Sequence, residues 1–449
     1  MLLKYKVQNY KSIAHSIEYS MFPTKENIKN DQVITIDTIK GPWKVLRRGA
    51  LLGPNASGKS SFIQSIDFAR NYIVEAQKSG RITGVKQFKG EFSDIGKDST
   101  FQFMFYKDGD IFEYGFTLDS FRVVEEWLMQ LTETTFEPIF ERVTNEEDKT
   151  EIELSSFFGS TNSKKRMIAE LLKETIQKNQ RNQLFLYKLS ENGFSIAEEI
   201  MDWFYNIQVI FPSSKVHMLE MSLMQNKSFA NFLSSKLINY DTGINKIFAQ
   251  TKKVQLTKLL KEMDIPQKII DEILEKRQGL VNINGRLFIF NEENGEPMLC
   301  EMILEHSLAG KVFPFHKDEE SDGTQRLLDL LPILFSLNSK SSVFFIDEID
   351  RCLHTKLTKT FISDFIKEEH KNQLIFTAHD VNLISLDELS QDEIWFIEKN
   401  KNGESCLKPF SDYTLNDDIK NGYSTIKSYL AGRFGAVPVI RGGDFNGIS

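Results

Sequence analysis

Gly53-Pro54-Asn55-Ala56-Ser57-Gly58-Lys59-Ser60 is the stretch that decides the fold of this chain. It matches the pattern G-x-x-x-x-G-K-[ST], in which successive backbone N–H groups turn inward around a phosphate group. A Cβ atom at either glycine would obstruct that curvature. Residues 49–52 before it are apolar and residues 61–66 after it favour a helix. The order is strand, loop and helix, so the sequence predicts a phosphate-binding loop, or P-loop.

The residues of this loop have separate predicted tasks. Lys59 is a point charge for the β- and γ-phosphates of a nucleotide, and the Ser60 hydroxyl is a ligand for Mg²⁺. The helix that begins at the end of the loop directs its positive end toward the same anion. The residues predicted to bind the nucleotide are Gly53, Asn55, Ser57, Gly58, Lys59, Ser60 and Ser61.

A pair of carboxylates stands far from the loop in the sequence, in Phe344-Phe345-Ile346-Asp347-Glu348. A buried strand that ends in two carboxylates places them at its carboxyl end, where ligands bind in open α/β sheets. We expect Asp347 to reach Mg²⁺ through water, and Glu348 to position and deprotonate the attacking water. A helix N-cap after a core strand is the alternative interpretation. Together with the P-loop, the pattern predicts one nucleotide site assembled from both ends of the chain.

Two more segments contribute candidate residues. Residues 374–378 are predicted to be a buried strand, and the next residue is His379, whose imidazole can hydrogen-bond the γ-phosphate or be purely structural. Ser321-Asp322-Gly323-Thr324 precedes an apolar helix at residues 327–331. In one interpretation the serine caps this helix. In the other, Ser321, Gly323 and the helix N-terminus form a second anion site.

The composition is that of a soluble protein with more than one core. Of 449 residues, 41% are hydrophobic and 36 are Phe, which is enough apolar material for two cores. The three cysteines, Cys300, Cys352 and Cys406, are far apart. They predict neither a disulfide framework nor a zinc site, which fits a reducing cytosol.

Neither a signal peptide nor a membrane span is expected. Residues 1–7 alternate like a strand, and the longest apolar stretch, residues 327–337, is interrupted by Asp329 and Pro332. The formal net charge of −8 argues against a uniformly basic surface for nucleic acid. We therefore expect a cytoplasmic protein without a membrane partner.

Three parts are expected along the chain: 1–125 with the P-loop and a β-lobe, 126–305 as a mainly helical insertion, and 306–449 with the other site segments. The β-lobe is indicated by a hairpin pattern at residues 101–116. The insertion is indicated by helical spacing at residues 167–172 and 269–274, with strands returning at 286–290 and 298–305 around Asn294-Gly295.

The order of these segments resembles that of the ABC-type ATPase heads of SMC, Rad50 and RecF relatives. The closer resemblance is to the AAA15 group of stand-alone ATPases, which includes the ATPase subunits of bacterial anti-phage and abortive-infection pairs (RloA/AbiLi and the PARIS component AriA). The residues that carry it are 320–324, 346–350 with Leu353-His354, 376–380 and 429–438. The resemblance implies an α/β fold, an ABC-type P-loop ATPase head with a mixed β-lobe and a parallel-sheet core, split by the insertion.

This resemblance also implies a site shared between two chains. ATP and Mg²⁺ would be the cofactors, and ATP on one P-loop would be capped by Ser321 and Gly323 of the other chain in a homodimer. Asp350 matches an acidic residue that touches the opposite site. The residues that would act within one chain are Lys59, Ser60, Asp347, Glu348 and His379.

Some features depart from the larger relatives. Asp322 and Thr324 stand where the signature pattern has glycine and glutamine, and both Gln87 and Gln102 are candidates for the Q-loop glutamine. No long coiled coil or zinc hook is present, and the residues after His379 are too few for an ordinary nuclease domain. Any nuclease or toxin is therefore expected on another protein.

The expected function is an ATP-hydrolysing switch that dimerises around nucleotide and holds or releases a separately encoded effector nuclease or toxin in anti-phage (abortive infection) defence. The alternative is a RecF-like DNA-repair clamp, in which ATP-dependent dimers grip duplex DNA. A nucleotide-binding scaffold without turnover is disfavoured because both Asp347 and Glu348 are present. An oligomer larger than the dimer and contact with DNA stay open.

Two groups of basic residues are expected on helices between the site segments. The first group is Lys164, Lys165, Arg166, Lys173, Lys178 and Arg181, and the second is Lys252, Lys253, Lys258 and Lys261. Such groups are commonly solvated faces, and they can also form a docking surface for an acidic partner or nucleic acid.

Overall fold

The chain forms two compact units. Unit 1 comprises Met1–Pro212, Leu337–Asp350 and Ile362–Ser449, and unit 2 comprises Ser213–Ser336 and Arg351–Phe361. This computed structural model describes residues 1–24, 30–78, 80–90, 98–155, 158, 163–179, 181–216, 218–256, 260–261, 265–276, 279–283, 286–290, 296–338, 340–367, 370–383 and 389–413.

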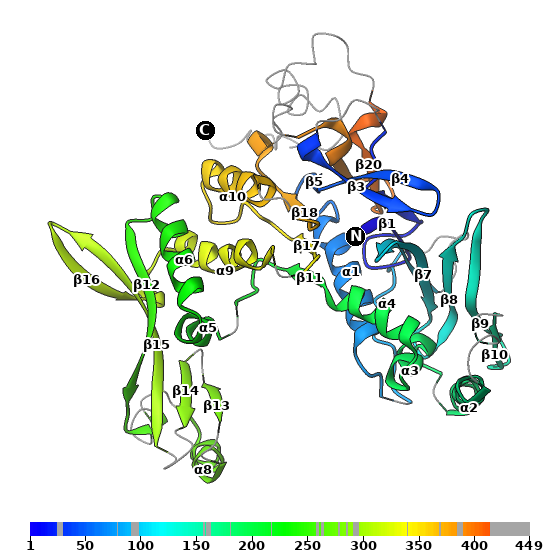
Figure 1. The fold of residues 1–449 in the computed structure, drawn as a ribbon, viewed down its shortest axis with the longest axis horizontal. Coiled ribbons are helices and arrows are strands. Elements are labelled where there is room, and N and C mark those ends of the chain that lie inside the picture. The colour runs from blue at the N-terminus through cyan, green and yellow to red at the C-terminus, as the bar shows by residue number, and fades with distance from the viewer. Residues whose placement is uncertain are drawn as a thin grey trace, which may run out of the picture. The chain divides into compact units, whose positions relative to one another are not determined.

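Unit 1 contains a six-stranded sheet in the order β11-β17-β18-β5-β19-β20, parallel except at the β19–β20 pair (Figure 1). The strands are β5 (Arg48–Leu52), β11 (Ile207–Ile210), β17 (Val343–Ile346), β18 (Gln373–Ala378), β19 (Ile394–Lys399) and β20 (Ser405–Pro409). β5, β17 and β18 are buried along their whole length, as continuous apolar strands of a parallel sheet are. Because these three strands are neighbours, the P-loop, the carboxylate pair and His379 follow adjacent carboxyl ends.

A seven-stranded antiparallel sheet in the order β10-β9-β8-β7-β6-β1-β2 forms the β-lobe of unit 1. Burial alternates along β6, as expected of a strand with one face on a core. The strands are β1 (Leu2–Gln8), β2 (Ile17–Ser20), β6 (Ser99–Lys107), β7 (Asp110–Leu118), β8 (Val123–Leu131), β9 (Phe136–Thr144) and β10 (Thr150–Leu154), and β3 (Val33–Thr38) pairs with β4 (Gly41–Leu46) in a separate hairpin.

Helix α1 (Lys59–Val74) connects the P-loop to the core of unit 1. The Tyr5 hydroxyl on β1 donates to Ser65 Oγ at 2.9 Å, and the rings of Tyr5 and Phe62 lie 5.6 Å apart in an edge-to-face arrangement. Packing against the β-lobe therefore holds the helix whose first turn faces the phosphate site. The other helices of this unit are α2 (Ser163–Asn179), α3 (Phe185–Glu191) and α4 (Ser195–Tyr205), with α10 (Thr355–Lys367) beginning in unit 2 and ending in unit 1.

A buried ion pair joins α3 to the β-lobe. Glu126 on β8 and Arg142 on β9 are both fully buried, with 3.5 Å between Oε2 and Nη1. The Glu126 carboxylate also accepts the backbone N–H groups of Phe185 and Leu186 at 2.7 and 2.9 Å. Burial raises the pKa of Glu126, and the Arg142 guanidinium opposes that shift. The carboxylate thus anchors the start of α3 to the sheet.

Unit 2 contains a five-stranded antiparallel sheet in the order β12-β15-β14-β13. The fifth strand, β16, pairs with residues 303–308 of β15, whereas β14 pairs with residues 297–300 of the same strand. Helix α6 packs along β12 (Figure 1), and the rings of Phe229 on α6 and Phe335 on α9 are 5.0 Å apart. The elements are α5 (Leu219–Gln225), α6 (Lys227–Asn239), β12 (Ile244–Lys253), α8 (Gln267–Lys276), β13 (Leu280–Ile283), β14 (Arg286–Phe290), β15 (Pro297–Leu308), β16 (Lys311–His316) and α9 (Asp322–Ser336).

The predicted fold class is confirmed: an α/β fold with a β-lobe and a parallel-sheet core. The β-lobe is antiparallel rather than mixed. Residues 126–305 differ from the mainly helical insertion that we expected, because they hold strands β9 to β15 besides helices α2 to α8. Buried and exposed positions do not alternate strictly along β12 and β15, so the period of two that identifies a strand is weak in their sequences.

Two predicted features lie outside the described residues, the Asn294-Gly295 turn and the segment 429–438. The hairpin predicted at residues 101–116 is formed by β6 and β7. In the part of the chain that the structure describes, no helix is long and apolar enough to cross a membrane.

Candidate nucleotide-binding site

The P-loop has a backbone geometry that requires both of its glycines. Gly58 has a φ of 114°, a conformation that residues with a Cβ atom rarely adopt. A Cβ atom on Gly58 would lie 2.0 Å from Ser405 Oγ, and one on Gly53 would lie 2.1 Å from the carbonyl oxygen of Ile397. A side chain at either position would therefore push the loop away from β19 and β20.

Lys59 is the first residue of α1 and its side chain is folded back into the loop. Its Nζ donates to the carbonyl oxygens of Gly53 at 2.7 Å and Pro54 at 3.1 Å. Burial lowers the pKa of Lys59 to about 8, and nearby carboxylates offset this shift only in part. The ammonium group is thus held where phosphate oxygens can take the place of the two carbonyl oxygens.

The remaining loop residues fit a phosphate group. Ser57 Oγ is buried and has no hydrogen-bond partner among the described residues. The first turn of α1, which includes Ser60 and Ser61, holds no acidic residue, so its N–H groups and dipole favour an anion. Asn55 is exposed at the turn of the loop. An unpaired buried hydroxyl and an acid-free helix start suit the binding of a nucleotide phosphate, with the Ser60 hydroxyl available to Mg²⁺.

Asp347 and Glu348 follow β17, and a residue of the neighbouring strand β18 contacts both. The Thr377 hydroxyl donates to Asp347 Oδ1 at 2.7 Å and accepts the backbone N–H of Glu348 at 2.8 Å. Asp347 is only 3% exposed, and Glu348 has a φ of 48°, which is uncommon for a residue with a Cβ atom. Thr377 therefore holds the side chain of Asp347 and the backbone of Glu348.

His379 lies between the lysine and the second carboxylate. Its Nδ1 is 3.4 Å from Lys59 Nζ, and its Nε2 is 3.7 Å from Glu348 Oε1. β5, β18 and β17 thus bring together three groups that the sequence separates widely. Contact of this imidazole with the outermost phosphate of a bound nucleotide stays a prediction.

The carboxylate of Asp350 binds the backbone of its own chain. Its Oδ2 accepts the N–H groups of His379 at 2.9 Å and Asp380 at 2.7 Å, which fixes the loop that carries the histidine. The resemblance assigned this residue to the opposite site of a dimer. That contact stays a prediction, and the structure adds a role within the chain.

Ser321 and Gly323 belong to unit 2, at the start of α9. Ser321 Oγ accepts the backbone N–H of Thr324 at 3.1 Å, which is the cap that one interpretation predicted. A Cβ atom on Gly323 would lie 2.7 Å from the carbonyl oxygen of Cys352, so this glycine is needed for a close backbone approach. Asp322 lies in the first turn of α9. Binding of ATP from a second chain by these residues stays a prediction.

Sequence reasoning missed a basic cavity of about 720 Å³ beside the P-loop. Ser405 Oγ donates to the carbonyl oxygen of Ser57 at 2.7 Å and lies 2.8 Å from Ser12 Oγ on the cavity wall. Gln87 lines the cavity, whereas the other Q-loop candidate, Gln102, lies on β6. The lysines that line it are Lys11, Lys86, Lys89 and Lys399. Because they come from three separate segments, no local run of sequence revealed the cavity.

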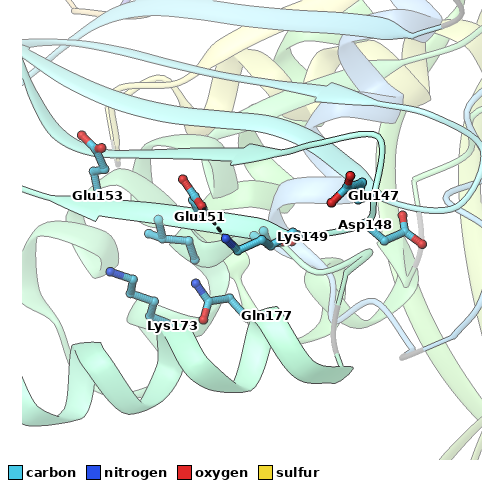
Figure 2. A pocket seen from close by; sticks show the side chains of 9 residues that line it. Glu147, Asp148, Lys149, Glu151, Glu153, Lys173 and Gln177 are labelled. Carbon is cyan, nitrogen blue, oxygen red and sulfur yellow. Dashed lines mark ion pairs between the residues drawn. The ribbon is translucent and has the colours of Figure 1, made fainter.

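The first basic group lies partly opposite acidic residues. Lys173 on α2 points toward β10 across a cavity of about 580 Å³ (Figure 2). Lys149 in the same cavity pairs with Glu151 at 3.2 Å. The acidic residues that line this cavity are Glu147, Asp148, Glu151 and Glu153. Of this group, Lys164 and Arg166 are exposed at the start of the helix, so the basic surface is smaller than the sequence suggested.

The second basic group is helical only in part, because Lys261 lies in a helix and Lys252 and Lys253 do not. Lys252 and Lys253 end strand β12, because the hydrogen bonds of that segment go to β15. They pair with Glu301 at 2.7 Å and Glu296 at 2.6 Å, so acidic partners already neutralise both. Lys258 lies outside the described residues.

Comparisons with known proteins agree with this geometry. The family model described as "AAA domain, putative AbiEii toxin, Type IV TA system" matches residues 50–385, well over half of the chain. No curated protein matches. Among solved structures, the SMC head domain from Thermotoga maritima is similar, with 12% identity over 91% of this chain and 98% of that one and a TM-score of 0.38.

Two further solved structures are similar. The SmcHead bound to the C-winged helix domain of ScpA has 12% identity over 93% of this chain and 99% of that one, with a TM-score of 0.43. The Smc head domain derived from Pyrococcus furiosus, bound to the C-terminal domain of ScpA, has 15% identity over 91% and 96%, with a TM-score of 0.38. Because the family model spans its P-loop, carboxylate pair and histidine, the chain belongs to the family described as "AAA domain, putative AbiEii toxin, Type IV TA system".

Proposed function

We propose that this protein hydrolyses ATP and acts as a dimerising switch in bacterial anti-phage defence. The observation that carries the proposal is the convergence of Lys59, Glu348 and His379, with His379 3.4 Å from the lysine amine and 3.7 Å from the carboxylate. A phosphate-binding lysine, a carboxylate base and an imidazole can together supply the positioning and electrostatics that account for most of the catalysis of phosphoryl transfer to water.

Each group has a distinct task in this proposal. Lys59 exchanges its contacts with the Gly53 and Pro54 carbonyl oxygens for contacts with phosphate oxygens. Glu348 orients the attacking water and accepts its proton. His379 donates to an oxygen of the outermost phosphate. Mg²⁺, held by Ser60 and through water by Asp347, would neutralise charge on the β- and γ-phosphates.

Dimerisation would complete the site. Ser321, Gly323 and the N-terminus of α9 would face the ATP of the second chain, because a helix start with a glycine offers N–H donors to phosphate oxygens. Asp322 in the first turn of α9 would have to point away from those oxygens. Hydrolysis then separates the two chains. The energy of ATP would thus drive a change of conformation, and through it the holding or release of an effector protein.

The defence role draws support from the family description, which names a putative AbiEii toxin of a type IV toxin–antitoxin system. We propose that the protein acts in the cytoplasm with a separately encoded nuclease or toxin. The test is phage challenge of cells that carry this gene with its native neighbours, using wild type and Lys59→Ala. Protection should require Lys59. Undiminished protection by the variant would contradict the proposal, and DNA-damage sensitivity on deletion without any effect on phage would favour a repair clamp.

A further inference from the structure

Thr377 is a polar residue in the middle of an apolar site strand. β18 is buried at every position, and the Thr377 side chain is completely buried. Burying a hydroxyl costs free energy unless it is hydrogen-bonded. The Thr377 hydroxyl bonds to two groups on the loop after β17: Asp347 Oδ1, which accepts at 2.7 Å, and the backbone N–H of Glu348, which donates at 2.8 Å.

Each of these two hydrogen bonds has a separate consequence. A carboxylate that accepts from a fixed hydroxyl loses rotational freedom, so Asp347 is held in one orientation. Glu348 has a left-handed backbone, with a φ of 48°, which residues with a Cβ atom adopt only when the surroundings support it. The bond from its N–H to Thr377 Oγ1 provides such support, and it sets the direction in which the Glu348 side chain leaves the chain.

The backbone reinforces the same junction. The N–H of Ile349 donates to the carbonyl oxygen of Thr377 at 3.0 Å, and Asp350 accepts the N–H groups of His379 and Asp380. The loop after β17 and the loop after β18 are thus joined from both sides. Thr377 is the member of this network whose side chain contacts both the Asp347 carboxylate and the backbone N–H of Glu348.

We propose that Thr377 is a positioning residue that aims Asp347 toward Mg²⁺ and Glu348 toward the attacking water. This proposal rests on the ATPase function proposed above and names the residue that regulates the geometry of the same site. In this proposal Thr377 itself contacts neither the nucleotide nor the metal. Residues that orient a metal ligand through a hydrogen bond typically change metal affinity about 10–100-fold when they are removed.

The test compares three variants. Thr377→Val keeps the shape and removes both hydrogen bonds, and Thr377→Ser keeps the hydroxyl. The matched control is Thr358→Val on α10, because Thr358 is also completely buried and its Oγ1 has no hydrogen-bond partner among the described residues. The main measurement is the Mg²⁺ dependence of binding of a fluorescent, non-hydrolysable ATP analogue, so it does not rely on turnover. Circular dichroism and thermal unfolding show whether each variant is folded.

Thr377→Val should bind the analogue in EDTA as wild type does, and should require about 10–100-fold more Mg²⁺ for tighter binding. Thr377→Ser should restore the wild-type Mg²⁺ dependence, and Thr358→Val should never lose it. If Thr377→Val does not fold, Thr377→Ala takes its place. Wild-type Mg²⁺ dependence in a folded variant that lacks the hydroxyl overturns the inference, as does an equal loss in Thr358→Val. Wild-type protein that neither binds nor hydrolyses ATP overturns the proposed function instead.

Discussion

The amine of Lys59 and Nδ1 of His379 lie 3.4 Å apart, although the residues stand near opposite ends of the sequence. Because an ammonium group only donates, this contact is favourable when Nδ1 carries no proton. The proton of a neutral imidazole is then on Nε2, which faces Glu348 Oε1 at 3.7 Å. Lys59, His379 and Glu348 therefore form a line of alternating donors and acceptors.

Glu348→Gln and Lys59→Ala should fail in different ways. The glutamine keeps the shape of the side chain but is not a base, so hydrolysis should fall by about 10²–10⁴ while ATP binding and a trapped ATP-bound dimer persist. Lys59→Ala removes the charge that meets the phosphates, so binding itself should be lost. Equilibrium binding and gel filtration with ATP separate the two outcomes. Wild-type hydrolysis by Glu348→Gln would contradict its assignment as the base.

ATP affinity should depend on pH through Lys59. Burial lowers the pKa of this lysine to about 8 in the absence of nucleotide. A bound polyphosphate favours the ammonium form and raises that pKa, so binding takes up a proton once the pH exceeds about 8. Affinity should then weaken by about tenfold for each pH unit above that point. The measurement is a binding titration from pH 7 to 10.

The matched control for this pH dependence is Lys59→Arg, because a guanidinium stays protonated over the whole range. Whatever its absolute affinity for ATP, Lys59→Arg should bind ATP with an affinity that does not change with pH. The buried Lys59 should change the free energy of unfolding of wild type with pH in the opposite direction to the change in ATP affinity. The lysine binds fewer protons when folded than when unfolded between about pH 8 and its ordinary pKa, so that contribution rises with pH there. Equal pH profiles for the two proteins would contradict the role of Lys59.

The composite site predicts complementation between inactive chains. Lys59→Ala should disable the P-loop of its own chain, and Ser321→Arg should block the cap that this chain offers to its partner. A mixed dimer keeps one intact combination, formed by the P-loop of the Ser321→Arg chain and the cap of the Lys59→Ala chain. ATPase activity should therefore return on mixing, to about a quarter of wild type under random exchange, because about half of the dimers are mixed and each keeps one of its two sites. Continued inactivity after subunit exchange has been verified would refute the shared site.

The sequence predicted the parts of the site that depend on local patterns. The P-loop, residues 343–346 and residues 373–378 each combine a continuous apolar run with a sharp change to glycine or polar residues, and each is a buried strand followed by a loop in the structure. Their convergence also followed from the sequence, because parallel strands of one sheet present their carboxyl ends at the same edge.

Features that depend on contacts between distant segments could not be predicted. Thr377 looks like one more residue of an apolar strand until its partner on β17 is known. Glu126 and Arg142 stand among other charged residues on β8 and β9, and only the fold shows that both are buried. Lys252 and Lys253 look like a basic helix because nothing nearby in the sequence reveals the acidic residues on β15 and next to it.

Replacing Arg142 alone should destabilise the β-lobe more than replacing Arg142 and Glu126 together. Arg142→Ala leaves the Glu126 carboxylate buried without its counter-charge, which typically costs about 3–5 kcal/mol of unfolding free energy. Replacing both, as Arg142→Met with Glu126→Gln, removes both charges, and the single amide oxygen can still accept one of the two N–H groups, of Phe185 or Leu186, that the two carboxylate oxygens accept separately. Urea unfolding should therefore rank the double variant as the more stable one. The reverse ranking would show that the ion pair itself supplies the stability.

The start of α2 should bind the partner of this switch. Lys164 and Arg166 are exposed there, next to a helix N-terminus that also favours anions. Replacing both by Gln should weaken binding to an acidic effector or to DNA, and binding to wild type should fall as salt increases because the Debye length is only about 8 Å at physiological ionic strength. ATP hydrolysis should not change. The matched control is Lys252→Gln with Lys253→Gln, which removes two lysines already paired with acids. Pull-down and DNA-binding measurements that rank the two double variants equally would leave the α2 residues as an ordinary solvated face.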